Sequence, residues 1–89
     1  MSKFRKKPVV IEAEQFIEGP GIRLPFYVPN ERPSPMRFDA ARARYLIDTL
    51  EGPHTVSDRD WIIKGIKGEF YACKPDIFAA TYEAVEESK

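Results

Sequence analysis

The sequence contains a single cysteine and a single histidine among its 89 residues, and this scarcity excludes two common supports of small domains. Cys73 has no second cysteine with which to form an intrachain disulfide, and Cys73 with His54 cannot supply the ligands of a structural zinc site. A chain of this length buries only about 60% of the surface that its unfolded form exposes. We therefore expect one domain over residues 1–89 that holds no cofactor and for which self-association is the remaining support.

Net charge and long apolar runs are absent as well. The charges of fourteen basic and fourteen acidic residues cancel. This balance argues against the long-range positive potential that most nucleic-acid-binding proteins use, and against an acidic protein that mimics DNA. The longest apolar stretches have three or four residues, far short of the ~20 needed to span a bilayer. We expect a cytoplasmic protein with no membrane partner and with nucleic acid as an unfavoured one.

The basic residues are nevertheless unevenly distributed. Lys3, Arg5, Lys6 and Lys7 crowd the start of the chain. They form either a solvated terminus or a basic contact patch.

Strand patterns dominate what the sequence does contain. Short β-branched or aromatic runs bounded by turn residues predict strands. These runs are Val9–Phe16, Ala43–Leu50, His54–Val56, Trp61–Ile66, Glu69–Cys73 and Thr81–Val85. A tight turn at Lys67–Gly68 predicts a hairpin, and Pro75–Ala80 predicts one or two helical turns.

The fold class that follows is mainly β (or α+β): a small bent antiparallel sheet or open barrel with one short helical turn. The side chains expected in its core are Val10, Ile11, Leu46, Ile63, Phe70 and Phe78.

Five of the eight prolines fall between Pro20 and Pro35, which predicts an irregular surface loop at about residues 19–36. Asp39, just after it, is a candidate cap for a helical turn. Within the loop, apolar side chains mark either a contact surface or a cover over one end of the core. They are Leu24, Phe26, Tyr27 and Val28.

No set of residues predicts catalysis. The only trio of nucleophile, base and orienting group is Cys73, His54 and one of Asp58, Asp60 or Asp76. A cysteine on a predicted strand arm is better explained as a small buried hydrophobe, and the three aspartates lack the spacing of a calcium loop. We expect no enzyme.

Aromatic residues near lysines leave open a nucleic-acid platform. Trp61, Phe70 and Tyr71 occur near Lys64, Lys67 and Lys74. Core packing explains these aromatics better, because a domain this small needs most of its large side chains inside.

Three segments resemble a family of small phage and prophage proteins that carry a Pro-Gly-Asp-Tyr-Gly type motif. They are Phe4–Ala13, Thr49–Gly52, and Asp60–Tyr71 with its continuation through Cys73–Phe78 and Thr81–Glu83. Asp58 and Arg59 stand where a glycine commonly precedes the aspartate of that motif, so the turn before Trp61 departs from the pattern. The resemblance implies a phage origin and a shared small fold, and it implies no activity.

The function that we favour is therefore that of a small non-catalytic phage accessory protein that binds a host or phage protein through the proline-rich loop. A small-ligand or nucleotide-sequestering protein and a weak nucleic-acid binder remain as alternatives. Self-association also stays open, because free strand edges invite pairing.

Overall fold

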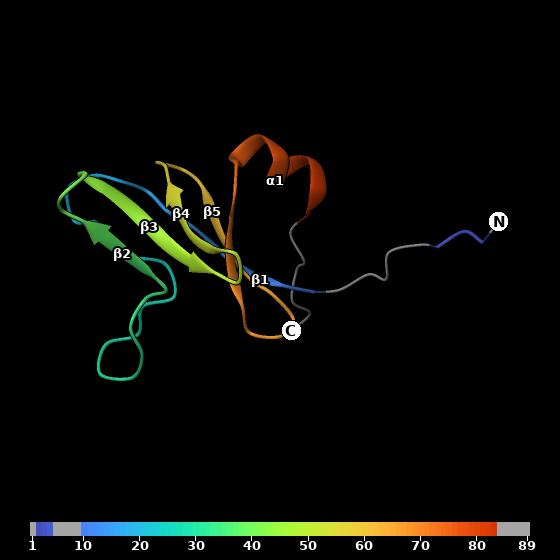
Figure 1. Cartoon of the computed structure of the whole chain (residues 1–89), viewed down its shortest axis with the longest axis horizontal. Coiled ribbons are helices and arrows are strands. Elements are labelled where there is room, and N and C mark those ends of the chain that lie inside the picture. The colour runs from blue at the N-terminus through green and yellow to red at the C-terminus, as the bar shows by residue number, and fades with distance from the viewer. Residues whose placement is uncertain (1, 5–9, 84–89) are drawn as a thin grey trace, which may run out of the picture.

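The computed structural model describes residues 2–4 and 10–83. In this part of the chain, six strands are followed by one helix (Figure 1). The elements are β1 (Glu12–Gln15), β2 (Met36–Asp39), β3 (Arg44–Thr49), β4 (Gly52–Val56), β5 (Trp61–Lys64), β6 (Phe70–Cys73) and α1 (Pro75–Thr81). The strands form two three-stranded antiparallel sheets, ordered β1-β5-β6 and β2-β3-β4. The predicted mainly β class with one short helix is confirmed, and the described strands do not close into a barrel.

The sheet β1-β5-β6 is covered on both faces. Ile62 and Ile63, consecutive residues of the middle strand β5, point to opposite faces, and both are fully buried. Ile62 belongs to the core between the two sheets, whose fully or nearly buried members also include Phe16, Phe26, Met36, Ile47 and Val56. On the opposite face, Trp61 stacks on Phe78 of α1 with ring centroids 4.2 Å apart. The helix is therefore a second covering layer (Figure 1).

The hairpin β5–β6 forms where the sequence predicts it. Its loop is Ile66–Gly68: the N–H of Gly68 donates to the Gly65 carbonyl at 3.0 Å, and the N–H of Gly65 donates to the Glu69 carbonyl at 2.7 Å. Gly68 has φ 83°, a conformation that glycine adopts without a Cβ penalty. Alternation along β6 then directs Phe70 and Ala72 to the inter-sheet core, and Tyr71 to the face that α1 covers.

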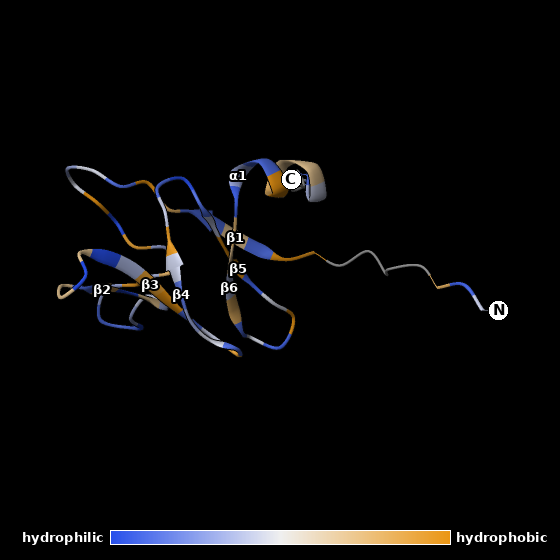
Figure 2. Cartoon of the chain, turned by 45° about the horizontal axis from the view of Figure 1, so that its top comes forward, coloured by the Kyte–Doolittle hydropathy of each residue, from blue (hydrophilic) through white to orange (hydrophobic). Residues whose placement is uncertain are grey.

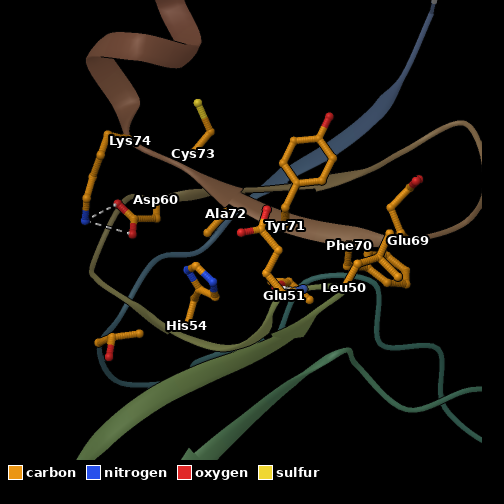
Figure 3. A pocket seen from close by; sticks show the side chains of 12 residues that line it. Leu50, Glu51, His54, Asp60, Glu69, Phe70, Tyr71, Ala72, Cys73 and Lys74 are labelled. Carbon is orange, nitrogen blue, oxygen red and sulfur yellow. Dashed lines mark hydrogen bonds and ion pairs between the residues drawn. The ribbon is translucent and has the colours of Figure 1, made fainter.

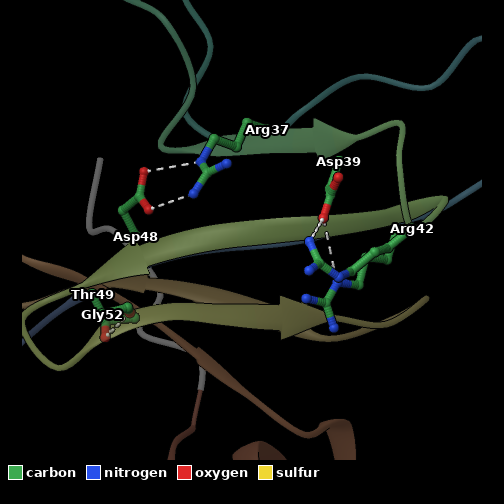
Figure 4. Close-up of polar contacts among 7 residues, drawn as sticks. Arg37, Asp39, Arg42, Asp48, Thr49 and Gly52 are labelled. Carbon is green, nitrogen blue, oxygen red and sulfur yellow. Dashed lines mark hydrogen bonds and ion pairs between the residues drawn. The ribbon is translucent and has the colours of Figure 1, made fainter.

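The second sheet is built from two hairpins around β3. Its strand β4 is an edge strand, which accommodates Pro53 because a proline there loses no ladder hydrogen bond. On its outer face Arg37 forms a two-pronged ion pair with Asp48, at 3.2 and 3.3 Å (Figure 4). Both side chains are more than half exposed, so the pair contributes little to stability.

No helix among the described residues is long and apolar enough to cross a membrane.

The predicted core is right in part. Leu46 and Ile63 are buried, whereas Ile11, Phe70 and Phe78 are half-buried. The prediction that Val10 lies in the core is wrong, because this residue is 77% exposed. It precedes β1, whose paired residues begin only at Glu12, so no neighbouring strand covers it.

Two further predictions fail locally. Asp39 does not cap a helical turn, because it ends β2, which pairs along its whole length with β3, and a hairpin turn follows it. The Asp39 carboxylate accepts the N–H of Ala41 at 3.2 Å and so supports the hairpin turn. The predicted strand at residues 81–85 is wrong in its described part, because Thr81 ends α1 and the next two residues are irregular; residues 84 and 85 lie outside the described part.

Candidate functional site

A concave surface on the described residues lies between the edge strands of the two sheets. We call it the inter-sheet hollow; it has a volume of about 500 Å³. One wall is the end of β3, the turn and β4, and the other is β6 with Asp60 before β5 (Figure 3). Its lining comprises Thr49, Leu50, Glu51, His54, Thr55, Asp60, Glu69, Phe70, Tyr71, Ala72, Cys73 and Lys74. The volume is within the range of small-molecule pockets, and the lining mixes apolar and charged groups.

Three members of the candidate catalytic set, His54, Cys73 and Asp60, line this hollow, but His54 and Cys73 do not form a dyad. His54 projects from β4 across the hollow toward Ala72, whereas the thiol of Cys73 projects from β6 away from the hollow, toward α1 (Figure 3). Burial raises the pKa of Cys73, and the nearby carboxylates of Asp60 and Asp76 raise it further. A thiol with a raised pKa stays protonated and is a poor nucleophile.

Asp60 is the buried charge of the hollow, with 2% of its surface exposed. One carboxylate oxygen accepts the N–H of Ser57 at 2.9 Å, and the ammonium of Lys74 donates to both oxygens at 3.2 and 3.4 Å. Through these contacts the Asp60 carboxylate connects the turn before β5 to Lys74 at the end of β6. Asp60 is therefore a structural residue in this arrangement.

Tyr71 lies on the face that α1 covers. Burial raises the pKa of Tyr71 to about 12, with a smaller contribution from a hydrogen bond with Tyr82. The phenol thus remains protonated throughout the neutral range and acts there as a packing and hydrogen-bonding group.

The turn before Trp61 has the backbone geometry of a glycine turn. Arg59 has φ 73°, in the left-handed region that favours glycine. Its backbone is fixed from both sides: its N–H donates to the Phe16 carbonyl at 2.7 Å, and its own carbonyl accepts the side-chain amide of Gln15 at 2.9 Å. The glycine-like turn forms even though the residue is an arginine.

The proline-rich loop is anchored on the core, and its four candidate contact residues have different environments. Phe26 is buried, 5% exposed, and packs edge-on against Phe70 at 5.2 Å. Leu24 and Val28 are half-buried, and Tyr27 is 44% exposed. Phe26 is thus an internal anchor of the loop rather than a surface contact, and Tyr27 is its outward-facing aromatic side chain.

The candidate basic patch is only partly within the described residues. Lys3 is exposed, whereas Arg5, Lys6 and Lys7 lie outside the described part of the chain. Elsewhere, the arginines of the β2–β3 hairpin are paired with acids: Arg42 bonds Asp39 at 3.3 Å (Figure 4). Burial acts to raise the pKa of Asp39, but the hydrogen bonds from Arg42 outweigh it and lower that pKa overall.

Sequence reasoning missed the inter-sheet hollow, since the residues that line it come from three separate segments. The available signal is an apolar residue, Leu50, directly before the Glu51–Gly52–Pro53 turn residues; the predicted strand ends on it, whereas β3 ends at Thr49 and Leu50 is exposed. Within residues 2–4 and 10–83, no group of three or more His, Cys, Asp or Glu side chains lies together as potential metal ligands. The chain matches no family model, no curated protein and no solved structure.

Proposed function

We propose that the protein is a non-catalytic accessory module of a phage that binds a host or phage protein in the host cytoplasm through its proline-rich loop. The observation that carries the proposal is the exposure of Tyr27 on a loop whose backbone is fixed on both sides of it. Tyrosine is enriched among the residues that dominate protein–protein binding energies.

The loop is held by contacts on each side of Tyr27. On one side, the N–H of Phe26 donates to the Glu14 carboxylate at 3.1 Å, and the carbonyl of the fully buried Pro25 accepts the Ser34 hydroxyl at 2.6 Å. On the other side, Val28 and Arg32 exchange two backbone hydrogen bonds, each 3.0 Å long.

This fixation favours binding because it lowers the entropy lost when a partner docks. A flexible loop must be ordered on association, at a cost of about 0.5–1.5 kcal/mol for each immobilised rotamer-rich side chain. A loop that is already locked by buried neighbours avoids much of the backbone part of this cost. The phage origin rests on the sequence resemblance alone.

The non-catalytic part of the proposal rests on the separation of the candidate groups. The imidazole of His54 points into the hollow, whereas the thiol of Cys73 points to the opposite face of β6, toward α1. The pKa of this thiol is also raised. A covalent mechanism needs these two groups within hydrogen-bond reach.

The test compares capture of proteins from host lysate by the wild-type chain, Tyr27→Ala, and Ile77→Ala as a matched control. Ile77 is 54% exposed on α1, so its truncation also removes an exposed apolar side chain. We expect a saturable partner that Tyr27→Ala loses and Ile77→Ala keeps, at unchanged melting temperature. Equal capture by both variants refutes the loop as contact surface. A melting temperature raised by nucleotides alone, or capture of only nucleic acid that is lost at moderate salt, favours the other function classes.

A further inference from the structure

Exposed aliphatic side chains flank the inter-sheet hollow. Leu50, on the β3–β4 turn, is 82% exposed, and Ile66, on the β5–β6 loop, is 74% exposed. Both turns lie at the same end of the molecule in Figures 1 and 2, and both tips are hydrophobic in Figure 2. Between them the hollow presents the half-buried ring of Phe70. The described residues therefore leave an apolar groove uncovered at this end.

The charge of the groove is negative. Among the charged lining residues, Asp60 and Lys74 neutralise each other at 3.2 Å, which leaves Glu51 and Glu69. Lys67, on the neighbouring loop, is not one of the lining residues. An occupant that complements this groove presents a large apolar side chain flanked by positive charge.

The beginning of the chain has this chemistry. Phe4 is 95% exposed, and the sequence places Lys3, Arg5, Lys6 and Lys7 around it. Among residues 2–4 and 10–83 no side chain buries Phe4, and none of them fills the groove.

The strand register makes the contact reachable. Glu12, the first residue of β1, is opposite Lys64, and Lys64 is opposite Phe70 across β5. The chain thus enters β1 at the end of the sheet where the hollow lies, about 10 Å from Phe70 for two strand spacings. The eight residue steps from Phe4 to Glu12 span at most about 29 Å when extended, which is enough to reach an adjacent copy.

We propose that the inter-sheet hollow receives the N-terminal segment of a second copy of the chain. Phe4 packs against Leu50 and Phe70, its basic neighbours face Glu51 and Glu69, and two copies exchange segments reciprocally about a twofold axis. The exchange supplies additional buried surface to a domain of this size that has no intrachain disulfide. It uses a different surface from the Tyr27 loop, so its success or failure is independent of the proposed protein partner.

The test measures the molar mass of the full-length chain in solution over a concentration series, by light scattering and sedimentation. We expect a concentration-dependent dimer that Phe4→Ser and Leu50→Ser each weaken by about tenfold or more. Ile77→Ser, an exposed apolar residue on α1, is the control that keeps wild-type association. Because Phe4 and Leu50 are exposed in the single chain, circular dichroism and melting of the dilute monomers should remain those of the wild type.

Mixing the two weakened variants tests the reciprocal exchange. The Phe4→Ser chain keeps an intact hollow and the Leu50→Ser chain keeps an intact segment, so their mixture should form one good contact and associate more tightly than either variant alone. Raising salt from about 0.05 to 0.5 M should weaken the wild-type dimer, since opposite charges form part of the contact.

A wild-type chain that is monomeric at all concentrations overturns the proposal, as does a dimer that both variants leave unchanged. A labelled peptide of residues 1–10 added to the Phe4→Ser chain should bind, and the same peptide carrying Phe4→Ser should not. If the peptide binds while the wild type stays monomeric, the segment occupies its own hollow and the exchange between copies is wrong.

Discussion

Arg59→Gly should stabilise the protein, although it removes a side chain and adds nothing. Arg59 has φ 73° at the third position of the turn from Ser57 to Asp60, in which the N–H of Asp60 donates to the Ser57 carbonyl at 3.1 Å. Left-handed backbone costs a residue with a Cβ about 1–2 kcal/mol. The turn cannot relax, because hydrogen bonds to Phe16 and from Gln15 fix the backbone of Arg59.

The net gain is smaller than the strain released. Glycine loses more backbone freedom on folding, which offsets about 0.5–1 kcal/mol of it. The ion pair of Arg59 with Asp58, at 4.0 Å between exposed side chains, contributes almost nothing. We therefore expect a gain of about 0.5–1 kcal/mol, or a melting temperature higher by about 2–8 °C for a domain of this size.

The assay is urea unfolding followed by the fluorescence of Trp61, the only tryptophan and a half-buried residue of β5. Arg59→Ala is the matched control, since it removes the guanidinium but keeps the Cβ and hence the strain. It should leave stability within about 0.5 kcal/mol of the wild type. The reasoning is refuted if Arg59→Gly is neutral or destabilising, or if Arg59→Ala stabilises as much as the glycine does.

Three further perturbations test the site. Asp60→Ala should cost about 1–3 kcal/mol in urea unfolding because it removes the acceptor of the part-buried hydrogen bond from the Ser57 N–H. Lys74→Met should cost less, since the lysine side chain is 56% exposed, and equal costs would assign the effect to the ion pair instead. Tyr71 should be the last tyrosine to ionise in an ultraviolet absorbance titration, near pH 12, and Tyr71→Phe should remove that step. Its raised pKa means that the folded state favours the neutral phenol, so this contribution to stability is complete below pH 10 and is lost as pH rises toward about 12. The thiol of Cys73, whose pKa is also raised, should react with iodoacetamide more slowly at pH 8 in the folded chain than in urea; equal rates would contradict the buried, protonated thiol.

Local patterns in the sequence were sufficient for the elements whose signals are local. The hairpin of β5 and β6 follows from two apolar runs around a glycine turn, and the helix follows from Pro75 at its first position. The class of fold was therefore predictable. β2 was not, because four residues after a proline-rich stretch become a strand only through their pairing with β3.

The site was less accessible to sequence reasoning than the fold. Phe26 carries the same apolar signal as Tyr27, and only the packing of its ring on Phe70 distinguishes an internal anchor from a surface contact. The left-handed turn at Arg59 was not predictable from arginine, which has no preference for that conformation. The hollow depends on how two sheets approach each other, and no single segment encodes that.

The pairing of β1 with β5 has a consequence for the order in which the chain folds. The whole of the second sheet, residues 36–56, lies in sequence between these partners, whereas that sheet is made of adjacent hairpins. Closing a long loop carries an entropic cost that neighbouring strands avoid, so we expect the β2-β3-β4 sheet to form early and β1 to join late. Ile47→Val should then slow folding, while Ala13→Gly should mainly speed unfolding, in stopped-flow kinetics. During synthesis β1 leaves the ribosome first, yet its partner strand emerges only after every residue of the other sheet.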